Sequence, residues 1–194
     1  MEKDLPVLMY IHGFRSGANG SKRAQLQVHL EGRYRVIAPE TDADPETSLA
    51  KLNEIIAKEK PEIIVGTSLG AWMSLMCNSG EARLVVVNPS THPDQTLSRW
   101  EGEELPYFCE RLDGVQTFTL TKEVLDKYKA YNIDSAIKTK SDRIWALCST
   151  ADELIGDIHI KTLKPLLNPG HLMIANDFGH RCSGPGLTLS LIHI

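Results

Sequence analysis

Short apolar runs alternate with longer amphipathic stretches along this chain of 194 residues. The runs are rich in Val, Ile and Leu, as expected for strands of a parallel sheet that helices cover on both faces. Because such alternation closes into a mostly parallel, doubly wound sheet, the pattern predicts a three-layer α/β fold. Six strands are expected, at residues 5–11, 34–38, 62–65, 84–87, 144–148 and 171–175.

Helices are expected between most of these strands. They cover residues 21–30, 46–58, 121–137 and 154–163, with one more beginning at Ser68. The first starts with Ser21, whose hydroxyl can cap a helix. The second follows Asp44 and Pro45, a capping residue and a proline suited to the first helical turn.

The pattern favours a single domain over residues 1–183, with one irregular excursion at residues 88–120. Several prolines interrupt the excursion, and it carries Trp100, Tyr107 and Phe108. These aromatic side chains are expected either to roof an acyl pocket or to pack the excursion onto the body of the protein.

The strongest chemical signal is a G-x-S-x-G pentapeptide at residues 66–70, directly after the third expected strand. On a sharp strand-to-helix turn of this kind, the central Ser68 takes a strained backbone conformation with its hydroxyl exposed. Gly66 and Gly70 remove side chains that would collide with the neighbouring helix or strand. The motif therefore predicts that Ser68 is a nucleophile.

Two backbone N–H groups are candidates for an oxyanion hole. The Leu69 N–H lies at the expected helix N-terminus, where backbone donors and the helix dipole favour negative charge. Residues 10–14 end the first strand and resemble the His-Gly turn that supplies the other donor in α/β-hydrolases, which assigns that role to the Phe14 N–H. His12 in this turn is interpreted as a ring that hydrogen-bonds loop backbone.

A base and an acid should follow the nucleophile, since hydrolases of this fold order their triad as Ser, then Asp or Glu, then His. His180 follows the last expected strand and is the candidate base. Asp152 follows the preceding strand and is the candidate acid, with Asp157 and Asp177 as alternatives. Asp142 precedes that strand and lies at the wrong end.

A set of short motifs resembles the YqiA-like small bacterial esterases, and the likeness spans nearly the whole chain. The motifs are at residues 11–16, 66–70, 87–89, 151–153 and 177–181. The resemblance implies a minimal α/β-hydrolase that acts on simple acyl esters, with acyl thioesters as further substrates. It carries over Ser68 as nucleophile, Asp152 as acid and His180 as base, in agreement with the assignment from the residues.

The chain departs from this family after His180. The family usually continues with an amphipathic helix, whereas here Gly-Pro-Gly at residues 184–186 breaks any helix and the following residues alternate like a strand. We therefore interpret residues 184–194 as an atypical tail and a candidate for non-native sequence.

Composition argues against several other classes of protein. The net charge is −4, from 21 basic and 25 acidic residues, and no basic block is present that would indicate nucleic-acid binding. The four cysteines lie outside zinc and thioredoxin-like spacings, which favours reduced thiols and a cytoplasmic location.

The glycine-rich residues 13–20 match no nucleotide-binding pattern, and no metal-ligand spacing is present, so no cofactor or metal is expected. The N-terminal apolar run is too short to span a membrane.

The sequence thus predicts a serine esterase that hydrolyses simple acyl esters through a Ser-His-Asp triad and an acyl-enzyme. Thioester or amide hydrolysis on the same fold, and a non-catalytic binding protein, stay open as alternatives. The expected partner is a small acyl ester or thioester, and nothing in the pattern fixes the number of subunits. Arg15 is expected to be solvated or ion-paired, with recognition of an anionic substrate as the alternative.

Overall fold

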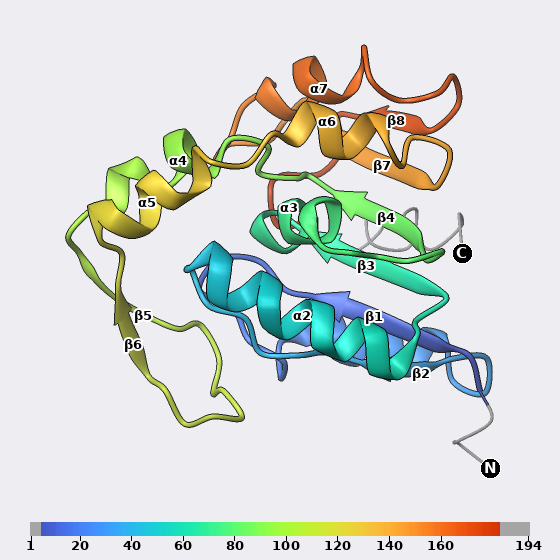
Figure 1. Cartoon of the computed structure of the whole chain (residues 1–194), viewed down its shortest axis with the longest axis horizontal. Helices are drawn as coiled ribbons and strands as arrows, with labels where there is room; N and C mark the ends of the chain where they lie inside the picture. The colour runs from blue at the N-terminus through green and yellow to red at the C-terminus, as the bar shows by residue number, and fades with distance from the viewer. Residues whose placement is uncertain (1–4, 183–194) are drawn as a thin grey trace.

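The computed structural model describes residues 5–182 and is built around a six-stranded sheet (Figure 1). Its strands are β1 (Val7–Ile11), β2 (Arg35–Ile37), β3 (Ile63–Thr67), β4 (Arg83–Val87), β7 (Ile144–Ser149) and β8 (Leu172–Ala175). They lie in the order β2-β1-β3-β4-β7-β8, and every neighbouring pair is parallel. All six predicted strands are confirmed, and so is the pairing of the first with the third.

Helices cover both faces of the sheet (Figure 1). The main ones are α1 (Ser21–His29), α2 (Pro45–Glu59), α3 (Leu69–Met76), α5 (Lys122–Tyr128), α6 (Ile133–Lys138) and α7 (Ile158–Leu163). Successive strand residues point to opposite faces, so Met9 and Ile11 join the core with α2 and α3, while Leu8 and Tyr10 pack with Leu26 of α1. This is the predicted three-layer, doubly wound architecture.

The first two helices begin differently from each other. Asp44 caps α2 as predicted, because its carboxylate accepts hydrogen bonds from two backbone N–H groups of the first turn, and Pro45 is the first helical residue. In α1, however, the N-cap is Gly20, and Ser21 is already helical. The predicted serine cap is therefore wrong, because the chain turns one residue earlier, through the hydrogen bond from Arg23 N–H to Gly20 O.

The predicted long helix at residues 121–137 is wrong in its continuity, because it is divided into α5 and α6. Asn132 separates them: its side chain accepts a hydrogen bond from Ser135 N–H and caps α6. Tyr128 and Ile133 both face the core although they are five residues apart, which a continuous helix does not permit.

The predicted helix at residues 154–163 starts late, since α7 begins at Ile158. The N–H groups of Leu154 and Ile155 instead donate hydrogen bonds to Asp152 Oδ1, at 3.0 and 2.9 Å. Gly156, with φ of 60°, ends this turn. The residues between β7 and α7 are therefore used to hold a carboxylate and do not extend the helix.

The excursion after β4 is more regular than expected. It contains α4 (Pro93–Thr96), a 3-10 turn (Ser98–Trp100) and an antiparallel hairpin of β5 (Glu104–Pro106) and β6 (Thr117–Thr119). Figure 1 shows the hairpin beyond the carboxyl ends of the sheet strands. The excursion therefore lies where ligands bind to doubly wound sheets.

Two further expectations concern the C-terminal tail and membrane-spanning segments. The atypical tail expected at residues 184–194 lies outside the described residues. Among the helices of residues 5–182, none combines the length and the apolar character that crossing a bilayer requires.

Candidate active site

Ser68 occupies a strained turn between β3 and α3. Its φ and ψ are 55° and −119°, a conformation that non-glycine residues rarely adopt. A Cβ at residue 66 would lie 2.6 Å from Ala71 Cα, and one at residue 70 would lie 2.2 Å from Ile11 O. Since real Cβ atoms do not approach so closely, the turn requires glycine at both positions, as the motif predicts.

Parallel pairing brings the carboxyl ends of β1, β3, β4, β7 and β8 to the same edge of the sheet. Gly66 of β3 is opposite Ile11 of β1, and Thr67 is opposite Val87 of β4. The Ser68 N–H donates to Val87 O at 3.0 Å, which fixes the turn to the neighbouring strand. The loops that follow β1, β4, β7 and β8 therefore converge around Ser68.

Ser68, His180 and Asp152 form one hydrogen-bonded chain. His180 Nδ1 lies 2.7 Å from Asp152 Oδ2, and His180 Nε2 lies 2.8 Å from Ser68 Oγ. Because an ionised carboxylate only accepts, Nδ1 carries the proton, and Nε2 of the neutral ring accepts from the Ser68 hydroxyl. The three residues that the sequence singled out are thus brought together in the order that proton transfer from serine to imidazole requires.

The Asp152 carboxylate is buried and held from two sides. Its side chain accepts hydrogen bonds from His180 and from the backbone of the turn that precedes α7. Burial raises the pKa of this carboxyl, but the His180 hydrogen bond and charge and the two backbone donors lower it by more. Asp152 therefore stays ionised and keeps the imidazole in one orientation.

Asn88 and Glu153 position the loop that carries His180, and sequence reasoning assigned neither of them a role. Asn88 Nδ2 donates to Gly179 O and His180 O, at 3.3 and 3.2 Å. Glu153 Oε2 accepts from the His180 N–H at 2.9 Å. Both follow strand ends within motifs of the family resemblance, which is the signal that could have identified them.

The two proposed oxyanion donors lie on adjacent strand ends. The register places the turn after β1 beside the start of α3, and a Cβ at Gly13 would lie 3.2 Å from Ser68 Cβ. Within the described residues, the N–H groups of Phe14 and Leu69 donate no backbone hydrogen bond. Among residues 5–182, neither N–H group is therefore tied to a backbone carbonyl.

His12 stabilises the turn after β1. Its ring is buried, with Nδ1 donating to Gly13 O at 3.0 Å and Nε2 accepting from the Thr41 N–H at 3.2 Å. Both ring nitrogens are therefore used within the loops that follow β1 and β2. The interpretation of His12 as a loop-positioning residue agrees with this geometry.

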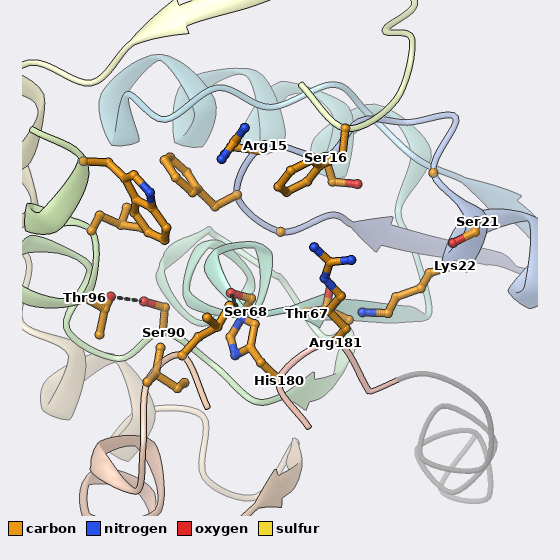
Figure 2. Close-up of a pocket in the computed structure, with 18 of the residues that line it drawn as sticks. Arg15, Ser16, Ser21, Lys22, Thr67, Ser68, Ser90, Thr96, His180 and Arg181 are labelled. Carbon is orange, nitrogen blue, oxygen red and sulfur yellow. Dashed lines mark hydrogen bonds between the residues drawn. The ribbon is translucent and has the colours of Figure 1, made fainter. Parts of the chain in front are cut away.

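A cavity of about 800 Å³ opens above Ser68 (Figure 2). Its apolar wall includes Phe14, Leu97, Trp100 and Ile155. Phe108 also lines it, whereas Tyr107 is not part of the lining. Of the aromatic residues of the excursion, Trp100 and Phe108 therefore line the cavity, while Tyr107 packs against other side chains.

The other candidate acids and histidines lie elsewhere. Asp157 forms an ion pair with Lys161 at 2.9 Å. The His171 ring stacks on Trp145, and its Nδ1 lies 2.9 Å from Ile144 O. Within residues 5–182, no three or more His, Cys, Asp or Glu side chains are grouped so that they could hold a metal ion.

Comparison with known proteins identifies the fold. The structure of Est1E from Butyrivibrio proteoclasticus superimposes with a TM-score of 0.73 and 15% identity, covering 99% of this chain and 88% of that chain. An esterase domain from Rhodothermus marinus superimposes with a TM-score of 0.68 and 14% identity, covering 98% of this chain and 86% of that chain. A monoacylglycerol lipase from Paleococcus ferrophilus superimposes with a TM-score of 0.66 and 15% identity, covering 97% of this chain and 93% of that chain. These similarities confirm the predicted α/β-hydrolase fold.

Comparison of the sequence itself gives a family. Residues 7–184 match UPF0227, an uncharacterised protein family. The match confirms the family resemblance seen in the motifs. A search among curated proteins gave no match.

Proposed function

Since the chain belongs to the protein family UPF0227, with residues 7–184 matched, we propose that it is a serine esterase. Its substrates are small acyl esters, and Ser68, His180 and Asp152 are its catalytic residues. The observation that carries this proposal is the hydrogen-bonded chain from Ser68 Oγ to the buried Asp152 carboxylate, with contacts of 2.8 and 2.7 Å.

The proposed reaction has two stages. His180 Nε2 takes the proton of the Ser68 hydroxyl as Oγ attacks the ester carbonyl, and then returns that proton to the leaving alcohol. The resulting acyl-enzyme is hydrolysed by water, which His180 deprotonates in turn. Asp152 keeps the Nδ1–H tautomer and stabilises the imidazolium that forms in each stage.

The Phe14 and Leu69 N–H groups receive the negative charge that develops on the carbonyl oxygen. These donors are already in position, so they need not rearrange as the charge forms. The positive end of the dipole of α3 stabilises the same charge. The strained backbone of Ser68 supports this role, since it presents Oγ and the following N–H to the same space. The apolar wall of the cavity provides a surface for the acyl chain.

The structures similar to this chain support the proposal. One of the similar structures is described as an esterase domain and another as a monoacylglycerol lipase. All of them share the fold on which nucleophile, acid and base follow strand ends in this order. This chain has a suitable side chain at each of those places.

The decisive experiment is activity-based labelling. A fluorophosphonate probe should label the protein, and peptide mapping should place the adduct on Ser68. Ser68→Ala should lose the label and lower kcat for p-nitrophenyl butyrate by about 10⁴-fold or more. Ser135→Ala, at an exposed position of α6, is the control and should keep both. Labelling or turnover that persists in Ser68→Ala would refute the proposed nucleophile.

Asp152→Asn tests the orienting acid. An amide in place of the carboxylate can bind the wrong imidazole tautomer, so kcat should fall by about 10³- to 10⁴-fold while the fold is retained. Circular dichroism and steady-state kinetics together check this result. An Asp152→Asn enzyme with near-normal kcat would remove Asp152 from the mechanism.

A further inference from the structure

The cavity above Ser68 is lined by cationic side chains. Arg15, Lys22, Arg99 and Arg181 all contribute to its wall, and among the described residues neither an aspartate nor a glutamate does. The chain as a whole has 25 acidic and 21 basic residues. A wall with four cations and no carboxylate therefore has the opposite sign to the net charge of the protein.

Two of these cations, Lys22 and Arg181, lie on one side of the nucleophile, and Arg15 and Arg181 both contact the ring of Phe108. We call Arg15, Lys22 and Arg181 the cationic wall. Figure 2 shows Lys22 and Arg181 on the same side of Ser68, with Ser90 and Thr96 on the opposite side. They come from three separate segments, namely the turn after β1, the first turn of α1 and the loop that carries His180. Only the tertiary fold brings them together.

Residues 5–182 leave the donors of the cationic wall largely unused. Arg15 donates through Nε to Pro106 O at 3.0 Å and stacks on Phe108 at 4.3 Å, so the described residues leave its two terminal nitrogens without an acceptor. The Cζ atom of Arg181 lies 5.4 Å from the centroid of the same ring. Within residues 5–182, no carboxylate forms an ion pair with Arg15, Lys22 or Arg181.

The like charges of the cationic wall repel one another, and a bound anion would reduce this repulsion. Burial lowers the pKa of Lys22, the neighbouring Cys182 raises it by less, and the positive charge of Arg181 lowers it again. A bound carboxylate or phosphate would reverse both lowering effects by pairing with the ammonium and replacing its lost hydration. Phe108 orients the guanidinium planes and so reduces the entropy lost when they bind an anion.

We propose that the cationic wall binds an anionic group of the substrate, a carboxylate or a phosphate, while the ester carbonyl lies at Ser68. This assignment rests on the proposed esterase function and names its substrate class, namely acyl esters that carry a negative charge away from the scissile bond. The apolar wall accepts the uncharged part of the same substrate.

Matched pairs of esters test this proposal. On the acyl side, the p-nitrophenyl monoester of suberic acid is compared with p-nitrophenyl octanoate. On the alcohol side, p-acetoxyphenyl phosphate is compared with phenyl acetate. The measured quantity is the ratio of kcat/KM for the anionic ester to that for its neutral partner, and the pair with the larger ratio identifies the side of the substrate and the kind of anion.

The wild-type protein should prefer the anionic member of at least one pair by about tenfold, and added NaCl should reduce that preference. Lys22→Gln and Arg181→Gln should each lower the ratio by roughly five- to tenfold, as the loss of one partly exposed charge contact requires. Lys22→Glu should lower it further. Arg23→Gln removes the same charge one residue along α1, outside the lining of the cavity, and should leave the ratio unchanged.

The outcomes separate this inference from the esterase proposal. If both neutral and anionic esters are hydrolysed with equal kcat/KM, or if Lys22→Gln and Arg181→Gln leave the ratio unchanged, the cationic wall does not bind the substrate and the esterase proposal stands. If no ester is hydrolysed and the fluorophosphonate probe does not label Ser68, both proposals fail.

Discussion

At the scale of single residues, Asn88 has more influence on the candidate site than its place outside the proposed triad suggests. It is fully buried, and its backbone has φ of 42°. Its Oδ1 accepts from the Ser149 N–H at 2.8 Å, while its Nδ2 donates to the carbonyls of Gly179 and His180. One amide side chain thus joins the ends of β4 and β7 to the loop that carries the imidazole.

Asn88→Ala should therefore affect both stability and activity. Removing the side chain leaves the buried Ser149 N–H without its acceptor and takes one donor from the carbonyls of Gly179 and His180, so the free energy of unfolding should fall by about 2 kcal/mol. The His180 loop should also lose its fixed position, and kcat should fall by about tenfold or more with little change in KM. Urea denaturation and ester kinetics measure the two effects.

The matched control is Asn176→Ala, an exposed residue of the same loop. This variant should change neither the free energy of unfolding nor kcat appreciably. If Asn88→Ala loses stability but keeps the wild-type kcat, Asn88 supports the fold and has no part in positioning His180.

At the scale of elements, the excursion between β4 and α5 depends on one buried arginine. Arg111 is 4% exposed and donates to Thr41 O at 2.9 Å and to Asp42 Oδ1 at 3.0 Å. It also lies 3.5 Å from the buried Glu40 carboxylate and 4.2 Å from the Tyr107 ring centroid. The loop before β6 is thereby fixed to the loop after β2.

Arg111→Met should loosen this attachment. The variant leaves the Glu40 carboxylate buried without its cation, so the free energy of unfolding should fall by about 3 kcal/mol. Amide hydrogen exchange in the excursion should accelerate, while the central strands should stay protected. Denaturation and exchange measured by mass spectrometry check both results.

A double-mutant cycle provides the control. The variant with both Glu40→Gln and Arg111→Met has no unpaired buried charge and should be more stable than Arg111→Met alone. Equal stability of the single and double variants would mean that the ion pair contributes little and that other contacts hold the excursion.

The separation of α5 from α6 belongs to the same scale. Hydrophobic periodicity over residues 121–137 is compatible with one helix, and the intrinsic signals for a break are weak. The break is decided by the Asn132 cap and by the need for both Tyr128 and Ile133 to reach the core. Packing against the sheet thus overrides local helical preference.

At the scale of the whole molecule, burial makes stability depend on pH. His159 is fully buried, and within the described residues its two ring nitrogens have no hydrogen-bond partner. Burial lowers its pKa below the ordinary value of 6.5. The unfolded chain therefore binds a proton that the folded protein does not, and this difference acts below about pH 6.5.

The free energy of unfolding should consequently fall as the pH is lowered from about 7 to about 5. His159→Leu should remove this part of the pH dependence. At pH 7 it should also be more stable than the wild type by about 1 kcal/mol, because two unpaired buried nitrogens are replaced by apolar surface. Urea denaturation at a series of pH values tests this, and an unchanged pH profile in His159→Leu would contradict it.

The order of apolar runs by itself determined the sheet, because fully covered parallel strands must be continuously hydrophobic. The G-x-S-x-G motif determined the sharp turn that carries Ser68, the proposed nucleophile, since only glycines fit beside so sharp a turn. Chain order then singled out Asp152 and His180, which the structure brings into one hydrogen-bonded chain with Ser68. These features are local or follow strand order, so they can be read along the chain.

Tertiary structure alone decided which side chains meet from distant segments. Asn88 reaches the His180 loop, Arg111 reaches Glu40, and the cationic wall forms from three separate turns. Asn88 and Arg111 lie about 70 to 90 residues from their partners, and Arg181 lies still farther along the chain from Arg15 and Lys22. The type of each residue is also compatible with an ordinary surface loop. Their roles depend on burial and on distances between loops, which the linear order of residues does not contain.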